Sequence, residues 1–501
     1  MSGSLSESLR LVREVMAANS RSGDTLEKAF LSPTGPATGL QVYDLEAPAK
    51  LLYPVLTPLR NKIPRVGGGR GIQANWRAIT AINPTKIGAG LGQGNRGGVI
   101  AQTTQDYYAA FRGIGLDNYV TFEADMSAEG FQDLKATAVQ SLLRALMIEE
   151  EYTILGGNGI TGLGTTPTPS LTAISSGGAI ASGVTVQVGC VALTLDGLRN
   201  SAVATGVPQI QTRVNADGST DTYGGGAAAP SVVATVTTSA ASSSVSGYVA
   251  PVVGAFGYAW YIGQGGTQYL FAVTTINSFL YTAALPASGF PFSLLSGDNS
   301  VNALVYNGFS AIAATPGSGA YWAAQPTGVN GTGTALTSDG SGGIVEIDTA
   351  LEAFWNNWRL GPSEMWVSSQ EQNFFRRKVL QAPSSGNLPL ARFTVATAQD
   401  NVRGGSSVRG YINPFGMGPA SEIPIRLHPD LPAGNIMFLT DELPYALNDV
   451  ANVYQIKTRK EYYQIEWPLR TRKYEYGCYA DEVLQHYFPP SLGFITGIAA
   501  G

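Results

Sequence analysis

The chain has 501 residues, of which 13% are charged and 44% are hydrophobic, and its formal net charge is −5. This hydrophobic content excludes a disordered chain, and the mildly acidic balance does not favour a surface that grips nucleic acid. The two cysteines, Cys190 and Cys478, cannot build a disulfide framework, so we expect buried thiols in a reducing compartment. The length exceeds what one ordinary core organises, which predicts two or three domains.

The first twenty residues predict an amphipathic arm. Leu5, Leu9, Val12 and Met16 recur at helical spacing. Charged residues at positions 7, 10, 13 and 14 stand where a signal peptide would need an apolar run. No later run has the length and apolarity of a membrane-spanning helix, so we expect no membrane partner.

A glycine-rich stretch, RVGGGRGIQANWRAI, occupies residues 65–79 and raises the question of a phosphate site. No Gly-Lys-Ser/Thr follows the glycines, as a phosphate-binding loop would require. A second pattern, with glycines at positions 92, 94 and 97, has dinucleotide-site spacing, but Pro84 interrupts the approach and no helical pattern follows. We therefore interpret the first stretch as a joint in the chain, since glycine permits conformations that other residues avoid.

One long helix is expected over residues 127–155, with Ser127 as its N-cap and Gly156 after its end. Its last turns carry Glu149, Glu150 and Glu151, three carboxylates that oppose the helix dipole. They are either solvated or paired with basic side chains from elsewhere.

Residues 165–340 form a separate compositional unit, because they hold only seven charged residues and no lysine or glutamate. The segment 183–195 alternates, with Val184, Val186, Val188 and Cys190 on one face. Further short strand patterns are separated by Gly, Ser and Pro, which predicts an inserted β-sandwich.

An α+β composition returns after this segment. The stretch 342–362 predicts a helix that is ended by Gly361-Pro362, and residues 364–369 predict a strand. A second helix is expected from Ser368, with Glu371 completing a capping box. From residue 452 onward, two or three antiparallel strands are expected.

Catalytic chemistry has no positive support in the sequence. His428 and His486 are the only histidines, and both are more typical of packed or surface residues than of a catalytic base. Asp217 and Asp221 share a loop that lacks the ligand pattern of a calcium site. Basic residues over 457–473 alternate with glutamates, which favours ion pairs on a strand face or a subunit contact. We expect no enzyme, no metal and no cofactor.

Four stretches together carry a resemblance to the major capsid (head) proteins of tailed bacteriophages, which have the Hong Kong 97-type fold. They are LEAPAKLLYPVLTPLRNKIPRVGGGRGIQANWRAI at 45–79, LMIEEEYTILGGN at 146–158, VEIDTALEAFWNNW at 345–358 and YGCYADEVLQHYFPPSLGFITGI at 476–498. The resemblance lies in the order of these elements, which flank the charge-poor unit on both sides.

The resemblance implies the α+β tailed-phage major capsid fold plus an inserted all-β, immunoglobulin-like sandwich. The implied parts are an N-terminal arm (1–60), an extended hairpin called the E-loop (61–126), the long spine helix of the peripheral or P domain (127–164), the insertion (165–340), the axial or A domain (341–445) and the C-terminal P-domain strands (446–501).

The implied function is that of a structural subunit. It would self-assemble through hexamers and pentamers into the icosahedral head shell of a virion, built in the cytoplasm of a host bacterium. The implied partners are further copies of the chain, portal, scaffolding and decoration proteins, and packaged double-stranded DNA that is contacted without sequence specificity.

The resemblance also implies a set of contact residues, since the E-loop would reach a neighbouring copy. Gly67, Gly68, Gly69 and Gly71 would be its hinge. Some family members crosslink through a lysine of this loop, and Lys86 is the only lysine within residues 65–125. We expect Glu149–Glu151 or nearby acids on a neighbour to be among the partners of Arg65, Arg70 and Arg77. The candidate inter-subunit contacts are Arg65, Arg70, Trp76, Arg77, Lys86, Arg96, Glu149, Glu150 and Glu151.

Two alternatives stay open. An encapsulin-like nanocompartment shares the implied fold and would differ in lacking packaged nucleic acid. A β-rich, glycan-binding adhesin centred on residues 165–340 would be a different class of protein, and the missing signal peptide argues against it.

Overall fold

The computed structural model describes residues 10, 13–14, 52–129, 132–340, 342–379, 408–416 and 421–500. The chain divides into two compact units, Met1–Tyr53 with Glu123–Leu134, and Pro54–Phe122 with Lys135–Gly501. The first unit holds most of the short helix α4 (Phe122–Ser127), whose Ser127 Oγ donates to Glu123 O over 2.6 Å. The apolar positions of the expected N-terminal arm lie outside the described residues.

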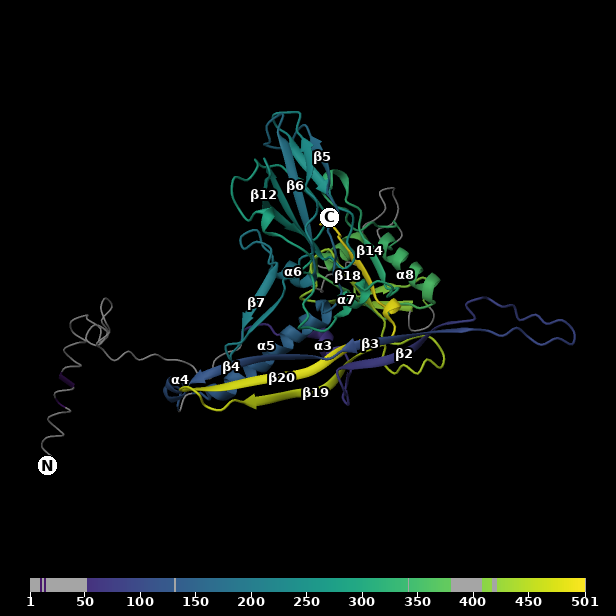
Figure 1. Cartoon of the computed structure of the whole chain (residues 1–501), viewed down its shortest axis with the longest axis horizontal. Coiled ribbons are helices and arrows are strands. Elements are labelled where there is room, and N and C mark those ends of the chain that lie inside the picture. Colours follow the sequence, from purple (N-terminus) through teal and green to yellow (C-terminus); the bar gives the residue numbers. More distant parts are fainter. Residues whose placement is uncertain are drawn as a thin grey trace, which may run out of the picture. The chain divides into compact units, whose positions relative to one another are not determined.

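A four-stranded sheet forms one body of the second unit, in the order β1-β19-β20-β4 (Figure 1). Its strands are β1 (Arg65–Val66), β19 (Tyr454–Glu466), β20 (Lys473–His486) and β4 (Arg112–Thr121). The long pair β19 and β20 is antiparallel, as the sequence predicts from residue 452 onward. Helix α5 (Leu134–Gly156) packs on this sheet through Leu142 and Leu146, which contact Tyr476 and Cys478.

The prediction of one long helix over residues 127–155 is wrong about where the helix starts. Helix α5 begins at Leu134, and Ser127 is the last residue of α4 instead of an N-cap. The glycine at position 130 lowers the helix propensity of the predicted first turn, which the apolar spacing alone does not reveal. The C-terminal end agrees with the prediction to within one residue, since Gly156 is the last helical residue.

A six-stranded mixed sheet has the order β14-β21-β18-β15-β17-β16. Helices α8 (Val345–Trp358) and α9 (Ser369–Val379) pack against it through Phe354 and Phe375. Arg359 ends α8 in the left-handed conformation, so the helix stops before the predicted Gly361-Pro362. The strands are β14 (Tyr321–Ala324), β21 (Gly493–Thr496), β18 (Ile436–Leu439), β15 (Glu364–Val367), β17 (Glu422–Leu427) and β16 (Gly410–Ile412).

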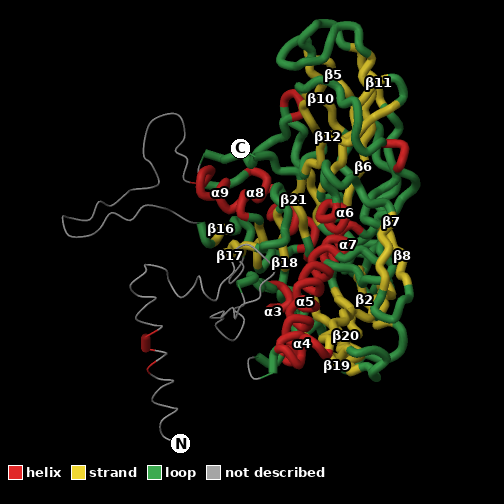
Figure 2. Tube along the Cα trace, turned by 90° about the vertical axis from the view of Figure 1, so that its left-hand side faces the viewer, coloured by secondary structure: helices red, strands yellow, loops and turns green. Residues whose placement is uncertain are grey.

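Two further sheets face each other across a shared apolar core, at one end of the unit in Figure 2. Val186, Val188 and Cys190 point into this core, which confirms the predicted alternation. One sheet is β12 (Thr267–Thr274), β11 (Gly257–Gln264), β6 (Thr185–Leu193) and β9 (Ala234–Thr237); the other is β13 (Ser278–Tyr281), β10 (Ser244–Tyr248) and β5 (Ser170–Ile174). The immunoglobulin-like assignment of this sandwich stays a prediction.

The charge-poor range 165–340 contains more than the sandwich. Strand β14 lies within this range but pairs with β21 of the six-stranded sheet, and helix α7 (Phe309–Ala314) packs near β19 through Phe309 and Tyr454. The remaining elements of the range are α6 (Leu195–Asn200), the hairpin β7 (Ile210–Val214) and β8 (Thr220–Gly224), η1 (Phe292–Leu294) and η2 (Val329–Gly331); a last turn, η4 (Pro489–Ser491), follows β20.

A central core joins these bodies. It contains Leu59 of the short helix α3 (Pro58–Lys62), Ile154 and Leu155 of α5, Trp366 of β15 and Tyr454 of β19. Both cysteines are buried and free, as the sequence predicts. Helix α3 and strand β1 therefore lie where the four-stranded sheet, α5 and the six-stranded sheet meet, directly before the hairpin described next.

Candidate functional site

Strands β2 (Gln73–Ile82) and β3 (Gln102–Ala110) form a two-stranded antiparallel hairpin with no third strand. The connecting residues 83–101 extend beyond both strands, at the right of Figure 1. A lone two-stranded hairpin is marginally stable in water. The base of this hairpin packs on its own chain, since Ala74 and Ala109 join the central core and Trp76 contacts Tyr487. The outer part of the hairpin would gain stability from another surface.

Large apolar side chains are exposed along this hairpin. Val99 is 89% exposed, and Ile82 and Leu91 are each about two-thirds exposed. Ile79, Ile100 and Tyr108 are exposed as well. Several large exposed apolar side chains on one hairpin favour an interaction site.

A local turn shapes the start of the connecting segment. The Asn83 side chain accepts the N–H of Ile87 and donates to the Ile87 carbonyl, at 2.9 and 3.0 Å. Asn83 and Lys86 both adopt left-handed backbone conformations, with φ of 53°. Lys86 and Arg96, two of the predicted contact residues, are both exposed in this segment.

The glycines before the hairpin satisfy defined structural needs. Gly68 and Gly71 have φ of 83° and 69°, in the left-handed region that glycine adopts readily. Gly69 donates its N–H to Thr458 O over 3.0 Å, and a Cβ there would stand 2.6 Å from Phe111 Cζ. The stretch is thus packed on β19, and the predicted hinge motion of these glycines stays a prediction.

The other candidate contacts of the hairpin lie near its base. Arg77 pairs across the strands with Asp106, at 2.5 Å between Nε and Oδ1, and both side chains are about two-thirds exposed. Trp76 is half-buried, with its ring stacked on Tyr107 at 5.8 Å. Arg70 is exposed between β1 and β2.

The base of the hairpin is held by helix α3, and Glu151 of α5 caps that helix. Thr57, the N-cap residue, makes no side-chain cap bond. Instead the backbone N–H groups of Leu59 and Arg60 donate to the two Glu151 oxygens, at 2.9 and 2.6 Å. His428 Nε2 lies 2.7 Å from Glu151 Oε1, and both side chains are fully buried. Glu151 thereby satisfies free backbone donors that a helix start leaves open.

The neighbouring Glu150 binds two arginines. Arg60 Nε lies 2.8 Å from Glu150 Oε2, and Arg65 also pairs with Glu150. Arg65 bridges to Glu482 of β20, at 3.0 Å between Nη1 and Oε2. The hydroxyl of Tyr306 donates to Glu482 Oε1 over 3.1 Å. We call this group the anchor cluster, and its members are Arg60, Arg65, Glu150, Glu151, Glu482 and His428.

Burial dominates the electrostatics of the anchor cluster. It raises the pKa of the Glu482 carboxyl, against the opposing effect of the Arg65 guanidinium. Burial also lowers the pKa of Arg60, although Glu482 and Glu151 favour its charged form. Tyr306, fully buried beside Glu482, has a pKa well above its usual value.

The predicted pairing of Glu149–Glu151 with basic residues of a neighbour is wrong for two of these acids. Glu150 and Glu151 are buried and bonded within the same chain, and Arg65 is one of the groups that bind Glu150. Glu149, one helix position away, is exposed and forms a bidentate pair with Arg199 at 2.7 and 3.1 Å. Successive helix positions point about 100° apart, so three adjacent glutamates do not share an environment.

A second ionic group fixes the other end of α3. Lys62 Nζ lies 2.5 Å from Glu364 Oε2 of β15 and 2.7 Å from Asp441 Oδ1. Arg426 of β17 binds the other Glu364 oxygen at 2.7 Å. Helix α3 is therefore held from both ends, although it has only five residues.

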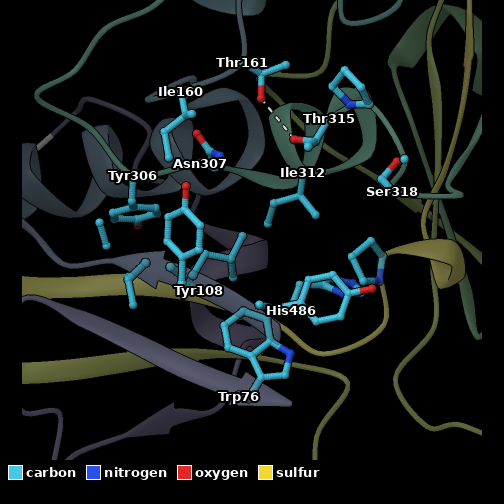
Figure 3. Close-up of a pocket in the computed structure, with 18 of the residues that line it drawn as sticks. Trp76, Tyr108, Ile160, Thr161, Tyr306, Asn307, Ile312, Thr315, Ser318 and His486 are labelled. Atoms are coloured by element: carbon cyan, nitrogen blue, oxygen red, sulfur yellow. Dashed lines mark hydrogen bonds between the residues drawn. The ribbon is translucent and has the colours of Figure 1, made fainter. Parts of the chain in front are cut away.

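An open cavity of about 310 Å³ lies at the base of the hairpin (Figure 3). Trp76, Tyr108 and His486 line one side of it, and Thr161 and Thr315, joined by a 3.0 Å hydrogen bond, line the other. Both ring nitrogens of His486 are buried without a hydrogen-bond partner among the described residues. Burial lowers the pKa of this imidazole to about 3.

Sequence reasoning missed Arg60, Glu482 and Tyr306, because their partners lie far away in the chain. His428 is a packed residue, as expected, but its contact with Glu151 joins positions 277 apart. Among the described residues, no group of three or more acids, histidines and cysteines is arranged to hold a metal ion. In that same part of the chain, no helix is both long and apolar enough to cross a membrane.

A scan against family models finds no match, and a search of curated proteins finds none either. Solved structures do align with the chain over most of its length. The capsid chain of a native GTA particle is 10% identical, with a TM-score of 0.41, and the alignment covers 92% of this chain and 96% of that one. The mature capsid chain of bacteriophage PhiM1 is 9% identical, with a TM-score of 0.36 and coverages of 94% and 98%.

The SrpI encapsulin of Synechococcus elongatus aligns as well. It is 7% identical, with a TM-score of 0.38, and the alignment covers 92% of this chain and 97% of that one. These chains are of the classes that the sequence resemblance names. Identities of 10% or less transfer no residue role to this chain.

Proposed function

We propose that this chain is the structural subunit of a closed protein shell, the head of a tailed phage, which encloses double-stranded DNA. The β2–β3 hairpin supplies the main contact, lying on a neighbouring copy within hexamers and pentamers. Portal, scaffolding and decoration proteins are the further partners of such a shell, and the virion is its location.

One observation carries this proposal: a long hairpin with exposed apolar side chains is mounted rigidly on a buried base. A flexible linker does not need two groups of ion pairs at its base. A hairpin that must present its surface at a fixed angle does need them. The exposed residues Ile82, Leu91 and Val99 gain free energy only when another surface covers them, at roughly 25 cal/mol per Å² of apolar area buried.

A repeated contact of this type builds closed shells. The hairpin and the surface that it covers are different parts of the chain, so the contact is heterologous and propagates from copy to copy until a rotation closes it. The mild net charge of −5 suits the subunit of a DNA-containing shell, because a strongly basic inner surface would bind the genome too tightly.

The test is assembly of the purified full chain, followed by sedimentation velocity and negative-stain microscopy. A variant in which residues 83–101 are replaced by Asn-Gly keeps β2 and β3 joined by a favourable two-residue turn. We expect the natural chain to form closed particles and the variant to remain a folded, small species. Particles of normal size from the variant would contradict the proposed role of the hairpin.

The content of the purified particles distinguishes the encapsulin-like alternative from a phage head. Particles made in the presence of a packaging system contain double-stranded DNA if the chain is a phage head subunit. Particles that consistently exclude DNA and retain a protein cargo favour the nanocompartment instead. For the adhesin alternative, strong glycan binding by a monomer would be required.

A further inference from the structure

The anchor cluster holds more negative than positive charge. Its three carboxylates, Glu150, Glu151 and Glu482, have side chains that are fully buried. Only two guanidinium groups, those of Arg60 and Arg65, face them at salt-bridge distance among the described residues. An unbalanced buried charge is costly, so a proton is a natural way to restore neutrality.

His428 does not supply the missing positive charge. Its Nδ1 accepts the backbone N–H of Asp430 over 3.1 Å, so this nitrogen carries no proton. The ring proton is therefore on Nε2, which donates to Glu151. A histidine that accepts through one nitrogen and donates through the other is neutral.

Other charged groups around the cluster are already matched or add further negative charge. Lys62 is bound by Glu364 and Asp441, and Arg199 by the exposed Glu149. The carboxyl of Asp430, which is half-buried beside His428, has a pKa raised mainly by burial. From β19, Tyr462 reaches the cluster: the guanidinium groups of Arg60 and Arg65 lie over its ring, and its hydroxyl donates to Glu150.

We propose that residues 57–66 form a proton-dependent latch, held tightly when Glu482 is protonated and more weakly when all three carboxylates of the anchor cluster are ionised. Glu482 is the natural site of the proton. Glu150 is bound by both arginines and Glu151 accepts two backbone N–H groups. Glu482 has the guanidinium of Arg65, which it shares with Glu150, and the neutral hydroxyl of Tyr306.

The direction of the pH effect follows from the raised pKa of Glu482. When the latch opens, this carboxyl returns to the ordinary value near about 4.3, so the closed state binds the proton more strongly. The opening constant therefore rises with pH, by up to about tenfold per pH unit between the ordinary and the raised value, and then levels off. Acid tightens the latch and neutral pH loosens it.

The latch deepens the proposed function, since α3 and β1 carry the hairpin. Loosening them gives the hairpin angular freedom, and tightening them fixes its direction. This consequence for shell building rests on the proposed function, whereas the latch is a property of the single chain and is measured without assembly.

Hydrogen–deuterium exchange of the unassembled full chain tests the latch directly. The amides of Leu59 and Arg60 donate to Glu151, so a peptide spanning residues 54–66 reports its opening. After correction for intrinsic exchange rates, we expect protection of this peptide to fall as the pH rises from about 4.3, by up to about tenfold per pH unit, and then to level off. A flat corrected profile in the natural chain would overturn the proposal.

Two variants identify the titrating group. Glu482→Gln mimics the protonated carboxyl and should keep the peptide protected throughout this pH range. Glu371→Gln is the matched control, because Glu371 is also a buried glutamate with a pKa raised by burial but lies on α9, outside the cluster. The control should retain the pH dependence of the natural chain. A pH dependence that survives in Glu482→Gln overturns the assignment, and if this variant does not fold, the profile of the natural chain still decides whether a latch exists.

Discussion

Glu151 of α5 accepts a hydrogen bond from His428 at 2.7 Å and, through the same carboxylate, the N–H groups of Leu59 and Arg60. One side chain thus ties the start of α3 to the spine-like helix α5 and to the loop after β17. The position of the hairpin depends on this buried contact because α3 and β1 lead directly into it.

Removal of the Glu151 carboxylate should be costly. Glu151→Ala leaves His428 and two backbone donors buried without their partner, so we expect the free energy of unfolding to fall by about 3 kcal/mol. Urea denaturation measures the change. Glu149→Ala is the control, since it breaks only the exposed pair with Arg199 and should cost less than about 1 kcal/mol. Equal losses of unfolding free energy in the two variants would show that the buried contacts of Glu151 stabilise the chain no more than the exposed pair of Glu149.

The glycines at the hairpin base should differ sharply in their tolerance of a methyl group. Gly69→Ala places a Cβ 2.6 Å from Phe111 Cζ and 3.0 Å from Thr458 O, so we expect a loss of about 1–3 kcal/mol. Gly67→Ala meets nothing closer than 3.9 Å and should be nearly neutral. Thermal unfolding of both variants checks this ranking, and a neutral Gly69→Ala would mean that the stretch is not packed on β19 as described.

Exposed apolar residues of the hairpin should matter for assembly and not for folding. Leu91→Asp with Val99→Asp should leave the melting temperature of the unassembled chain unchanged within error while abolishing particles. Val232→Asp serves as the control, because Val232 is similarly exposed but lies outside the hairpin. Sedimentation velocity distinguishes the cases. Normal particles from the double variant, or a comparable defect in the control, would contradict the assignment.

His486 should make the chain sensitive to acid. Its pKa is about 3 in the folded chain and about 6.5 when unfolded, so the unfolded state binds the extra proton in between. Stability is therefore fully present above about pH 6.5 and falls with decreasing pH, by up to about 1.4 kcal/mol per pH unit, until the pH passes the folded value.

The variant His486→Phe removes both unpaired nitrogens and this titration. We expect a shallower loss of unfolding free energy between about pH 6.5 and about pH 4, measured by urea denaturation at each pH. An unchanged slope would show that His486 is not buried in a neutral form. This effect has the opposite sign to that of Glu482, so the two groups can be told apart.

Local patterns in the sequence were sufficient to predict several helices and strands. Helix α8 and strand β6 follow from their own periodicity, because one face of each is apolar over its whole length. The pairing of β19 with β20 also follows from two adjacent strand patterns joined by a short turn. In each case the information lies within a few residues of where it is used.

The anchor cluster could not be predicted in the same way. Its contacts join residues 90 to 417 positions apart, such as Arg60 with Glu150 and Arg65 with Glu482. Three consecutive glutamates suggested a single charged surface, yet the helix turns Glu149 outward and the next two inward. Which of them is buried depends on where α3 packs, and the spacing of residues along α5 does not contain that information.

A density map of particles formed by the purified chain, at a resolution that traces the backbone, would show where the hairpin lies. We expect residues 83–101 of each copy to lie on a neighbouring copy, with Leu91 and Val99 covered. A map in which these residues fold back onto their own chain, or remain uncovered in a closed particle, would contradict this expectation.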